Sequence, residues 1–283
     1  MTNLRSLYAA TWMGLQHDLA WTTPVLSLAL RTVAPFASAI TVSIIYWFGS
    51  TAGGTNFTTF DPQRLAFVLV GSTLYAHVAS YAWVPTIAIA EGKNLAVFPH
   101  IYLTARSTAV YVAGRAVSAF MISTVTSLAA LAVAYYVLGS FLNTSMPIVI
   151  TPASAFLLGV ALIANIPAAL GLGYFLGAYS LYASKFEWSL PGYVAGLLMV
   201  FSGALFPPTI LPWPISAGAT YLPFTQFIAA ARVAIVPSLP GNYLYALFLC
   251  VVGGFLLLGV SLWVYFLAEK KARKDGVIDR RLA

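Results

Sequence analysis

Residues 153–182 read ASAFLLGVALIANIPAALGLGYFLGAYSLY, an apolar run without one charged side chain. A helix needs about 20 mainly apolar residues to cross the roughly 30 Å hydrocarbon core of a bilayer. Backbone polar groups in hydrocarbon must pair within the chain, which leaves helices or closed barrels. The run is too long and too continuous for the alternating strands of a barrel, each about ten residues long. The sequence therefore predicts a membrane-spanning helix here.

Five further stretches share this character and predict an all-α, polytopic membrane protein with six transmembrane helices. Of the 283 residues, 60% are apolar and only 7% are charged, whereas soluble domains carry roughly 25% charged residues. No soluble linker or obvious repeat divides the chain, so we predict a single domain over residues 1–283. It comprises an interfacial segment (1–24), six spans (25–268) and a tail (269–283). The predicted spans are residues 25–48, 65–89, 108–138, 153–182, 189–206 and 243–267.

Basic residues flank the predicted spans mainly on one side, whereas the opposite loops hold only Arg64 and Arg232, with Asp61. An excess of Lys and Arg marks cytoplasmic loops. We therefore expect a multi-pass protein of the plasma membrane with both termini in the cytoplasm. The net charge of +7 then reflects topology and contact with anionic lipid, and no nucleic-acid partner is needed to explain it. The basic residues on the cytoplasmic side are Arg5, Lys93, Arg106, Lys185, Lys270, Lys271, Arg273, Lys274, Arg280 and Arg281.

Two segments do not follow the pattern of a simple span. Residues 2–20 are less apolar, and their apolar side chains recur at helical spacing. This pattern suits a helix lying in the cytoplasmic interface; the alternative is a lead-in to the first span. Residues 205–241 hold seven prolines among apolar and aromatic side chains, which would repeatedly interrupt a helical ladder. We predict a re-entrant pair of short helices here, dipping in from the outer face before the last span.

Signatures of enzymes are mostly missing, and we predict no catalytic, cofactor-binding or metal-binding residue. The pair Gly92–Lys93 lacks the first glycine and the Ser or Thr of a phosphate-binding loop. The three histidines, His17, His77 and His100, lack metal-ligand spacing. No carboxylate lies in the middle of a predicted span, although coupled carriers usually rely on intramembrane ionisable groups. The energy for any transport is therefore expected to come from elsewhere.

The segment before the last predicted span carries a more specific pattern. Residues 202–207 read SGALFP, 211–212 LP, 221–225 YLPFT and 230–232 AAR. This order resembles the membrane subunits of type-2 ATP-binding-cassette (ABC) exporters, also classed as type V, which show small-Gly-x-Phe-Phe-Pro, Leu-Pro, Leu-x-Pro-Phe/Leu-Thr and Ala-x-Arg in turn. Residues 91–95, EGKNL, loosely match the acid-x-x-Gly-Thr-Leu-Glu stretch that follows the second span of the family. With the six-span layout, the resemblance covers essentially the whole chain.

The resemblance implies the permease subunit of an ATP-driven exporter. Such a subunit pairs with a second copy or a paralogous permease, and two separate ABC ATPase subunits bind ATP and Mg; the permease itself is no enzyme and holds no cofactor. It further implies that the ATPases act on the N-terminal helix and on residues 91–95. The coupling residues are Glu91, Gly92, Lys93, Asn94 and Leu95. The external gate comprises Phe206, Pro207, Leu211, Pro212, Pro223, Phe224 and Arg232.

Several alternatives stay open. Glu91 and Lys93 are either contacts to a partner or ordinary solvated charges, and Arg31 and Arg115 either extend helices into the cytoplasm or face a cavity. The glycine pairs with four-residue spacing allow close helix contact, within one subunit or between two. These pairs are Gly173 with Gly177 and Gly192 with Gly196; the family architecture favours the second for the dimer seam.

Two outer connections carry the acceptor pattern for N-glycosylation, at Asn56 and Asn143. For the function as a whole, the leading interpretation is export of an amphiphilic, lipid-linked or glycan cargo through a path between two subunits in the lipid bilayer. The alternatives are a self-contained channel or ion-coupled carrier and, less favoured, a membrane-embedded enzyme.

Overall fold

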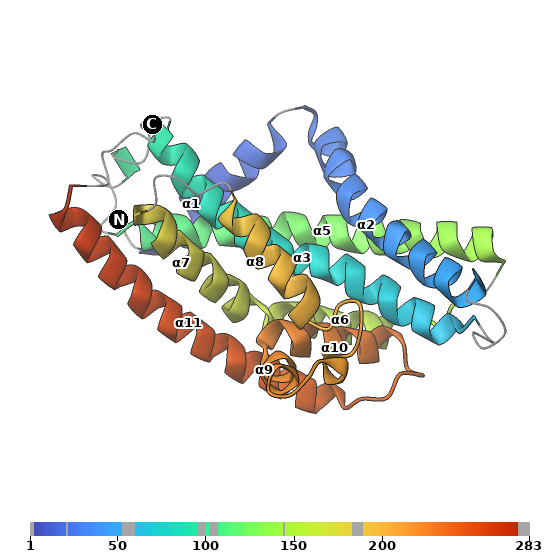
Figure 1. Ribbon diagram of the computed structural model, residues 1–283. Coiled ribbons are helices and arrows are strands. Elements are labelled where there is room, and N and C mark those ends of the chain that lie inside the picture. Colours follow the sequence, from blue (N-terminus) through green and yellow to red (C-terminus); the bar gives the residue numbers. More distant parts are fainter. Residues whose placement is uncertain are drawn as a thin grey trace.

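The part of the chain described by the computed structural model is helical and contains no β-strand (Figure 1). It covers residues 3–20, 22–52, 60–94, 100–101, 107–143, 145–182 and 189–276. The all-α prediction is confirmed for these residues. The elements are α1 (Asn3–Leu19), α2 (Pro24–Ala52), α3 (Pro62–Asn94), α5 (Ala109–Leu142), α6 (Pro152–Ala164), α7 (Ile166–Tyr182), α8 (Leu190–Phe201), the 3₁₀ helix η1 (Pro208–Ile210), α9 (Ile215–Tyr221), α10 (Pro223–Ile235) and α11 (Tyr243–Lys274).

Local sequence signals explain where several helices begin. Proline opens α2, α3, α6 and α10, where its missing N–H removes no helical hydrogen bond. Thr151 and Ser154 form a capping box before α6, and the Asn242 side chain accepts a hydrogen bond from the Tyr245 N–H at the start of α11. Asn143 ends α5 in the left-handed conformation, with φ 48°. The long helices therefore start and stop at residues that suit these positions.

Five helical segments are long enough and apolar enough to cross a bilayer: Pro24–Gly49, Pro62–Lys93, Ala109–Leu142, Pro152–Tyr182 and Tyr243–Lys274. They indicate a multi-pass membrane protein. The predicted count of six is not confirmed, because residues 189–206 contain only the 12-residue helix α8. A helix of that length rises about 18 Å, less than the roughly 30 Å of a hydrocarbon core. A turn through Gly203, with φ 67°, follows α8.

The proline-rich segment forms η1, α9 and α10, and Leu222 in an extended conformation separates the last two. Two short helices thus lie where the prolines predicted them, and their insertion into a membrane stays a prediction. α10 packs between α6, α11 and the start of α3, and it supplies Phe224 and Phe227 to the central core. The segment is therefore part of the folded body of the protein.

The long helices α3, α5, α7 and α11 run side by side, with α6 continuing α7 and α2 lying along α3 and α5 (Figure 1). α8 lies on α3, where the Tyr75 hydroxyl donates to the Ala195 carbonyl at 2.7 Å. α1 folds back across α5. We call the end of the bundle where α3, α7 and α11 finish and α5 begins the basic end, and the opposite end, which holds the start of α3, the distal end.

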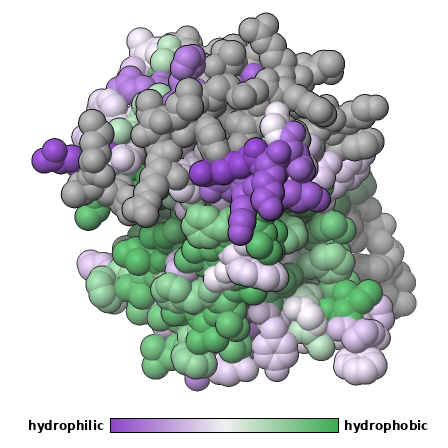
Figure 2. All heavy atoms as spheres, turned by 90° about the vertical axis from the view of Figure 1, so that its left-hand side faces the viewer, coloured by the Kyte–Doolittle hydropathy of each residue, from purple (hydrophilic) through white to green (hydrophobic). Residues whose placement is uncertain are grey.

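Lys93 of α3 and the described basic residues of α11 gather at the basic end, as the sequence predicted, whereas Arg64 of α3 lies at the distal end. Figure 2 views this end and shows hydrophilic side chains above a largely hydrophobic surface. At this end the Glu269 carboxylate of α11 accepts hydrogen bonds from the Thr108 N–H and hydroxyl, both at 2.9 Å, and from the Ser107 hydroxyl at 3.0 Å. A residue of the last helix thus caps the start of α5.

Candidate functional site

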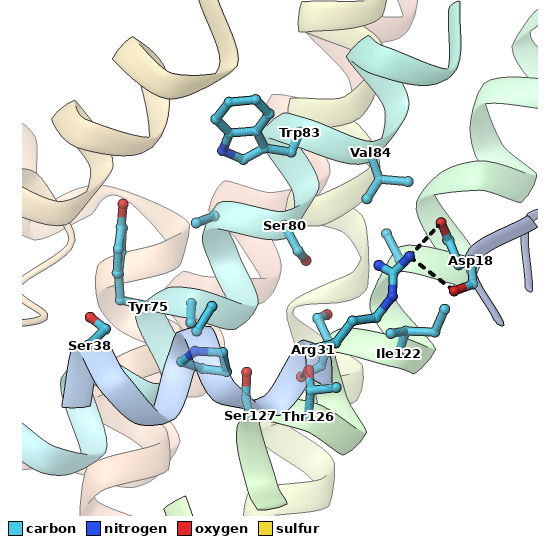
Figure 3. A pocket seen from close by; sticks show the side chains of 16 residues that line it. Asp18, Arg31, Ser38, Tyr75, Ser80, Trp83, Val84, Ile122, Thr126 and Ser127 are labelled. Atoms are coloured by element: carbon cyan, nitrogen blue, oxygen red, sulfur yellow. Dashed lines mark hydrogen bonds and ion pairs between the residues drawn. The ribbon is translucent and has the colours of Figure 1, made fainter. Parts of the chain in front are cut away.

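The C-terminal part of α1 is tied to two other helices by one buried carboxylate. Asp18 Oδ1 lies 3.3 Å from Arg31 Nη2 of α2 and 3.8 Å from Arg115 Nη2 of α5. The Arg31 guanidinium also donates to the Asp18 carbonyl at 3.0 Å (Figure 3). Two cations from different helices therefore share one anion, and we call Asp18, Arg31 and Arg115 the Asp18 clasp.

Small residues let α1 lie directly against α5. A Cβ atom added to Gly14 would come 2.4 Å from the Ser118 hydroxyl, and one added to Gly114 would come 2.4 Å from the Ala10 Cβ atom. Arg115 Nη1 donates to the Gly14 carbonyl at 3.2 Å in the same contact. Close backbone approach of this kind is typical of helix packing in membranes. The outward side of α1 exposes Leu4, Tyr8, Trp12 and Met13, which fits the predicted interfacial position.

α1 also contacts the end of α3, where the predicted coupling residues begin. His17 Nε2 lies 3.7 Å from Glu91 Oε2. A pocket of about 170 Å³ lies between α1, α3 and α5, and its lining includes His17, Glu91, Gly92, Ile101 and Arg115. Glu91, near the end of α3, is thus connected to the Asp18 clasp through α1.

The structure assigns different environments to the predicted coupling residues. Glu91 is half-buried and Gly92 is buried. Lys93 is also buried, and its ammonium group donates to the carbonyls of Ser180 and Leu181 at the end of α7. Lys93 is therefore not a solvated charge, because its ammonium group satisfies carbonyls of α7 that have no partner within their own helix. Its role in coupling stays a prediction. Asn94 is the last residue of α3, and Leu95 lies outside the described residues.

A cavity of about 410 Å³ opens between α2, α3 and α5, beside the Asp18 clasp. Figure 3 shows Arg31 and Asp18 at one end of it and Tyr75 and Ser38 toward the other, with Ser80 and Trp83 projecting from α3. Its lining is mostly apolar but carries hydroxyl groups from all three helices. The lining hydroxyls belong to Ser38, Tyr75, Ser80, Ser123, Thr126 and Ser127. Such a lining can accommodate a ligand that is partly apolar and partly able to form hydrogen bonds.

A polar cluster lies behind the wall of this cavity. Ser123, which lines the cavity, is 2.8 Å from His77 Nδ1, and His77 Nε2 is hydrogen-bonded to the Tyr81 hydroxyl. His77 is fully buried and is flanked by the Phe120 and Phe227 rings, at centroid distances of 5.3 and 5.8 Å. The cluster therefore joins α3, α5 and α10 at the centre of the bundle.

Arg232 holds the proline-rich segment to the rest of the distal end. Its guanidinium donates to the carbonyls of Phe67 at 3.1 Å, Gly203 at 2.8 Å and Ala204 at 2.6 Å. It also lies over the Phe67 ring, 3.4 Å from the centroid. These contacts connect α10 with α3 and with the turn after α8. Gly71 permits this arrangement, because an added Cβ would lie 1.9 Å from both Arg232 Nη2 and the Ala204 carbonyl oxygen.

The other predicted gate residues lie around this contact in different environments. Pro223 and Phe224 are buried at the start of α10. Phe206 and Leu211 are half-buried, and Pro207 and Pro212 are exposed on either side of η1. The structure thus brings Arg232, Pro223 and Phe224 into the core and leaves the η1 turn at the surface. A gating role for any of them stays a prediction.

The two glycine pairs differ in their surroundings. An added Cβ at Gly173 or Gly177 would contact Pro85 at 3.0 Å or Ile89 at 3.3 Å, so both pack within this chain. Gly192 faces Trp83 at 3.5 Å, whereas Gly196 has nothing within 4 Å. The assignment of Gly192 and Gly196 to a dimer seam stays a prediction. Of the glycosylation candidates, Asn56 lies outside the described residues and Asn143 caps α5.

The residues that the sequence did not single out are Asp18, His77 and Glu269. Each is a buried polar or charged side chain, and such groups are expensive inside a membrane protein unless they are paired. Their partners lie far away in the sequence, so only the charge itself was a signal. Within the described ranges, no cluster of three or more His, Cys, Asp or Glu side chains could hold a metal ion.

Comparison of the chain with protein-family models and with curated proteins found no match to either.

Proposed function

We propose that this chain is the membrane subunit of an ATP-driven exporter of the ABC type-2 kind, which moves an amphiphilic, lipid-linked or glycan cargo outward. It would act in a pair with a second copy or a related permease and with two separate ATPase subunits. In this proposal the basic end faces the cytoplasm and receives the ATPases. The proposal rests on the sequence resemblance and on the physical connection between the basic end and the cavity.

The observation that carries the proposal is the Asp18 clasp. A movement imposed on α1 or on the Glu91 end of α3 reaches α2 and α5 through Asp18, because its carboxylate contacts Arg31 and Arg115 directly. The same two helices form walls of the 410 Å³ cavity. A conformational change can be driven only by a differential interaction with its two states. The Asp18 clasp joins the surface proposed to bind the ATPases to the walls of the cavity, and it therefore supplies a route for that interaction.

The cavity supports the choice of cargo. Apolar side chains from α2, α3 and α5 offer contact to hydrocarbon or to the flat face of a sugar, and the hydroxyl groups offer hydrogen bonds. Of the described carboxylates, Asp18, Asp61, Glu91, Glu269 and Asp275, only Asp18 lines the cavity, and it is paired with Arg31 and Arg115. This distribution favours an external source of energy over coupling to ions through buried acids.

Reconstitution tests the proposal. The protein should copurify with an ATPase encoded beside it, and proteoliposomes holding both should show substrate-stimulated ATP hydrolysis across panels of lipids, glycans and drugs. Transport by the purified chain alone, driven by an ion gradient, would contradict the proposal.

Coupling through the end of α3 has a separate test. Charge reversal of Glu91 (Glu91→Lys) should reduce ATP-dependent transport. The protein should still fold, because Glu91 is only half-buried and His17 is its one ion-pair partner among the described residues. Reversal of the exposed distal Arg64 (Arg64→Glu) is the matched control. Unchanged transport and ATPase stimulation in the Glu91 variant would remove this residue from the coupling surface.

One observation favours the rival reading of an ion-coupled carrier. The cluster of His77, Tyr81 and Ser123 places a titratable ring at the centre of the bundle, next to the cavity. Intramembrane histidines can relay protons. A His77→Gln variant distinguishes the readings: proton-driven transport would be abolished by this change, whereas ATP-driven transport would retain its dependence on ATP.

A further inference from the structure

A second cavity, of about 360 Å³, lies at the distal end between α3, α10, α11 and the turn after α8. Its deep wall contains buried residues, Ser202, Gly203 and Arg232, and its rim contains the exposed residues Pro207 and Gly241. The volume is at the lower end of the roughly 300–1,000 Å³ that small-molecule sites occupy. A small group could therefore enter from the surface and reach the buried wall.

The charge at that wall is a cation without a matching anion. A guanidinium has five N–H groups, and Arg232 donates through each of its three nitrogens to one backbone carbonyl. No carboxylate of the described residues lies within ion-pair distance of it; Asp61, the acid described at the distal end, pairs with Arg64 at 3.6 Å. Carbonyl dipoles and the Phe67 ring stabilise the charge but do not cancel it. The wall of the cavity thus carries a net positive charge.

A second group at the wall also lacks a partner. Ser202 is fully buried, and its hydroxyl oxygen has no hydrogen-bond partner within the described part of the chain. Leaving a buried hydroxyl unpaired costs free energy, and an acceptor placed in the cavity would remove that cost. The hydroxyl hydrogen can rotate toward such an acceptor. Ser202 and Arg232 can therefore both donate hydrogen bonds to the same kind of ligand atom, a negatively charged oxygen.

The geometry points to an anion site in this cavity, which binds a phosphate group through Arg232 and Ser202. Guanidinium groups match phosphate oxygens with paired N–H bonds, and a tetrahedral group has oxygens to spare for a hydroxyl donor. The remaining lining includes Val233, Leu239 and Ala246, which suit the apolar part of a phosphate ester. The site lies at the end of the apolar helices, where lipid headgroups would meet the protein. It does not depend on the proposed export function.

Binding measurements on the full-length protein in neutral detergent test the site. The probes are dioleoylphosphatidylglycerol, dioleoylglycerol with the same tails but no phosphate, and inorganic phosphate, with bound ligand counted by native mass spectrometry. We expect phosphatidylglycerol to bind at least tenfold more tightly than dioleoylglycerol, about the contribution of one hydrogen bond to a charged group. Binding of inorganic phosphate with comparable affinity would identify the ligand as free phosphate, and its failure to bind would identify a lipid headgroup; both outcomes support the site.

Two variants leave the contacts of Arg232 in place. Ala229→Leu puts a larger side chain into the cavity that Ala229 lines, and Ser202→Ala removes the unpaired hydroxyl without breaking any described bond. Each should weaken phosphatidylglycerol binding about tenfold, while Arg64→Gln, which removes an exposed distal charge, should have no effect. Melting temperatures without ligand identify any variant that does not fold. Equal binding of the two lipids, wild-type binding by either cavity variant, or equal loss in the Arg64 control would overturn the assignment.

Discussion

The two ends of the bundle stabilise their arginines in opposite ways. At the basic end, Arg31 and Arg115 share the Asp18 carboxylate, which belongs to a third helix. At the distal end, Arg232 is held by three backbone carbonyls and one aromatic ring, without a carboxylate at ion-pair distance in the described chain. The first arrangement depends on side chains that can separate and pair again. The second depends on the backbone path itself, so it fixes one conformation of the turn after α8.

Because of this difference, we expect the two ends to tolerate amino-acid substitutions differently. An ion pair between helices can break as a unit when the helices move, whereas a cation bound by carbonyls of a turn holds that turn as long as the fold persists. We therefore expect substitutions at the distal end to affect stability most, and substitutions toward the surface of the basic end to affect stability least while affecting function.

The largest effect is expected from Arg232→Met. This change removes three hydrogen bonds from a charged donor and leaves three carbonyls without their partner, at about 1.5–3 kcal/mol for each such bond, partly offset because a charge no longer needs burial. We expect a loss of about 4 kcal/mol in the free energy of unfolding, measured by denaturant titration in micelles. The matched control, Arg64→Met, changes a side chain that is 77% exposed and should be neutral. A loss below 1 kcal/mol would mean that the turn does not depend on Arg232.

Gly71→Ala should come next. The added methyl group would lie 1.9 Å from the Ala204 carbonyl oxygen and from Arg232 Nη2, so α3 and the turn must move apart. Overpacking of this kind costs about 1–3 kcal/mol, and we expect the upper part of that range in the same unfolding titration. Gly259→Ala in α11, where nothing lies within 4 Å, is the control and should not destabilise the protein. Equal free energies of unfolding for the two variants would contradict the close contact at Gly71.

Asp18→Asn is expected to have an intermediate effect. It keeps the shape of the side chain but leaves Arg31 and Arg115 without their shared anion. Breaking a buried ion pair costs about 3–5 kcal/mol, and we expect about 2 kcal/mol because the Arg31 side chain is 39% exposed. Proteolysis should then release α1 before the other helices unfold. If α1 of the variant resisted proteolysis as well as in the wild type, its packing through Ala10 and Gly14 would be sufficient to hold it against α5.

Glu91→Gln should have the smallest effect on stability. The Glu91 side chain is 35% exposed and lies 3.7 Å from a histidine, and exposed pairs contribute about 0–1 kcal/mol. The melting temperature should therefore match that of the wild type. A large decrease would place Glu91 among the structural residues and would weaken the comparison between the two ends.

The sequence predicted the helical class, most element boundaries and a pair of short helices in the proline-rich segment, because these follow from apolar runs and from local backbone chemistry. It did not predict that the helix within residues 189–206 would be only the 12-residue α8, since the whole run is apolar and the turn through Gly203 is the only feature that interrupts it. Lys93 looked like a surface charge because the carbonyls of Ser180 and Leu181 that bind it are distant in sequence.

The candidate site was harder to predict for the same reason. The Asp18 clasp requires α1 to fold back on α5, which depends on the close contacts of Gly14 with Ser118 and of Gly114 with Ala10, residues that are far apart in the sequence. The role of Arg232 depends on backbone carbonyls, which no pattern of side chains encodes. Charges in apolar helices identify residues that need partners, but only the packing of the helices identifies those partners.

The cap that Glu269 provides for α5 has a consequence for biosynthesis. The backbone N–H of Thr108 receives its acceptor from a residue 161 positions later in the chain. While a ribosome makes the protein, the third long helix enters the bilayer with its first turn incomplete, and only insertion of the final helix completes it. Nascent chains that stop short of Glu269 should therefore show this turn accessible to amide exchange, and those that include it should show it protected.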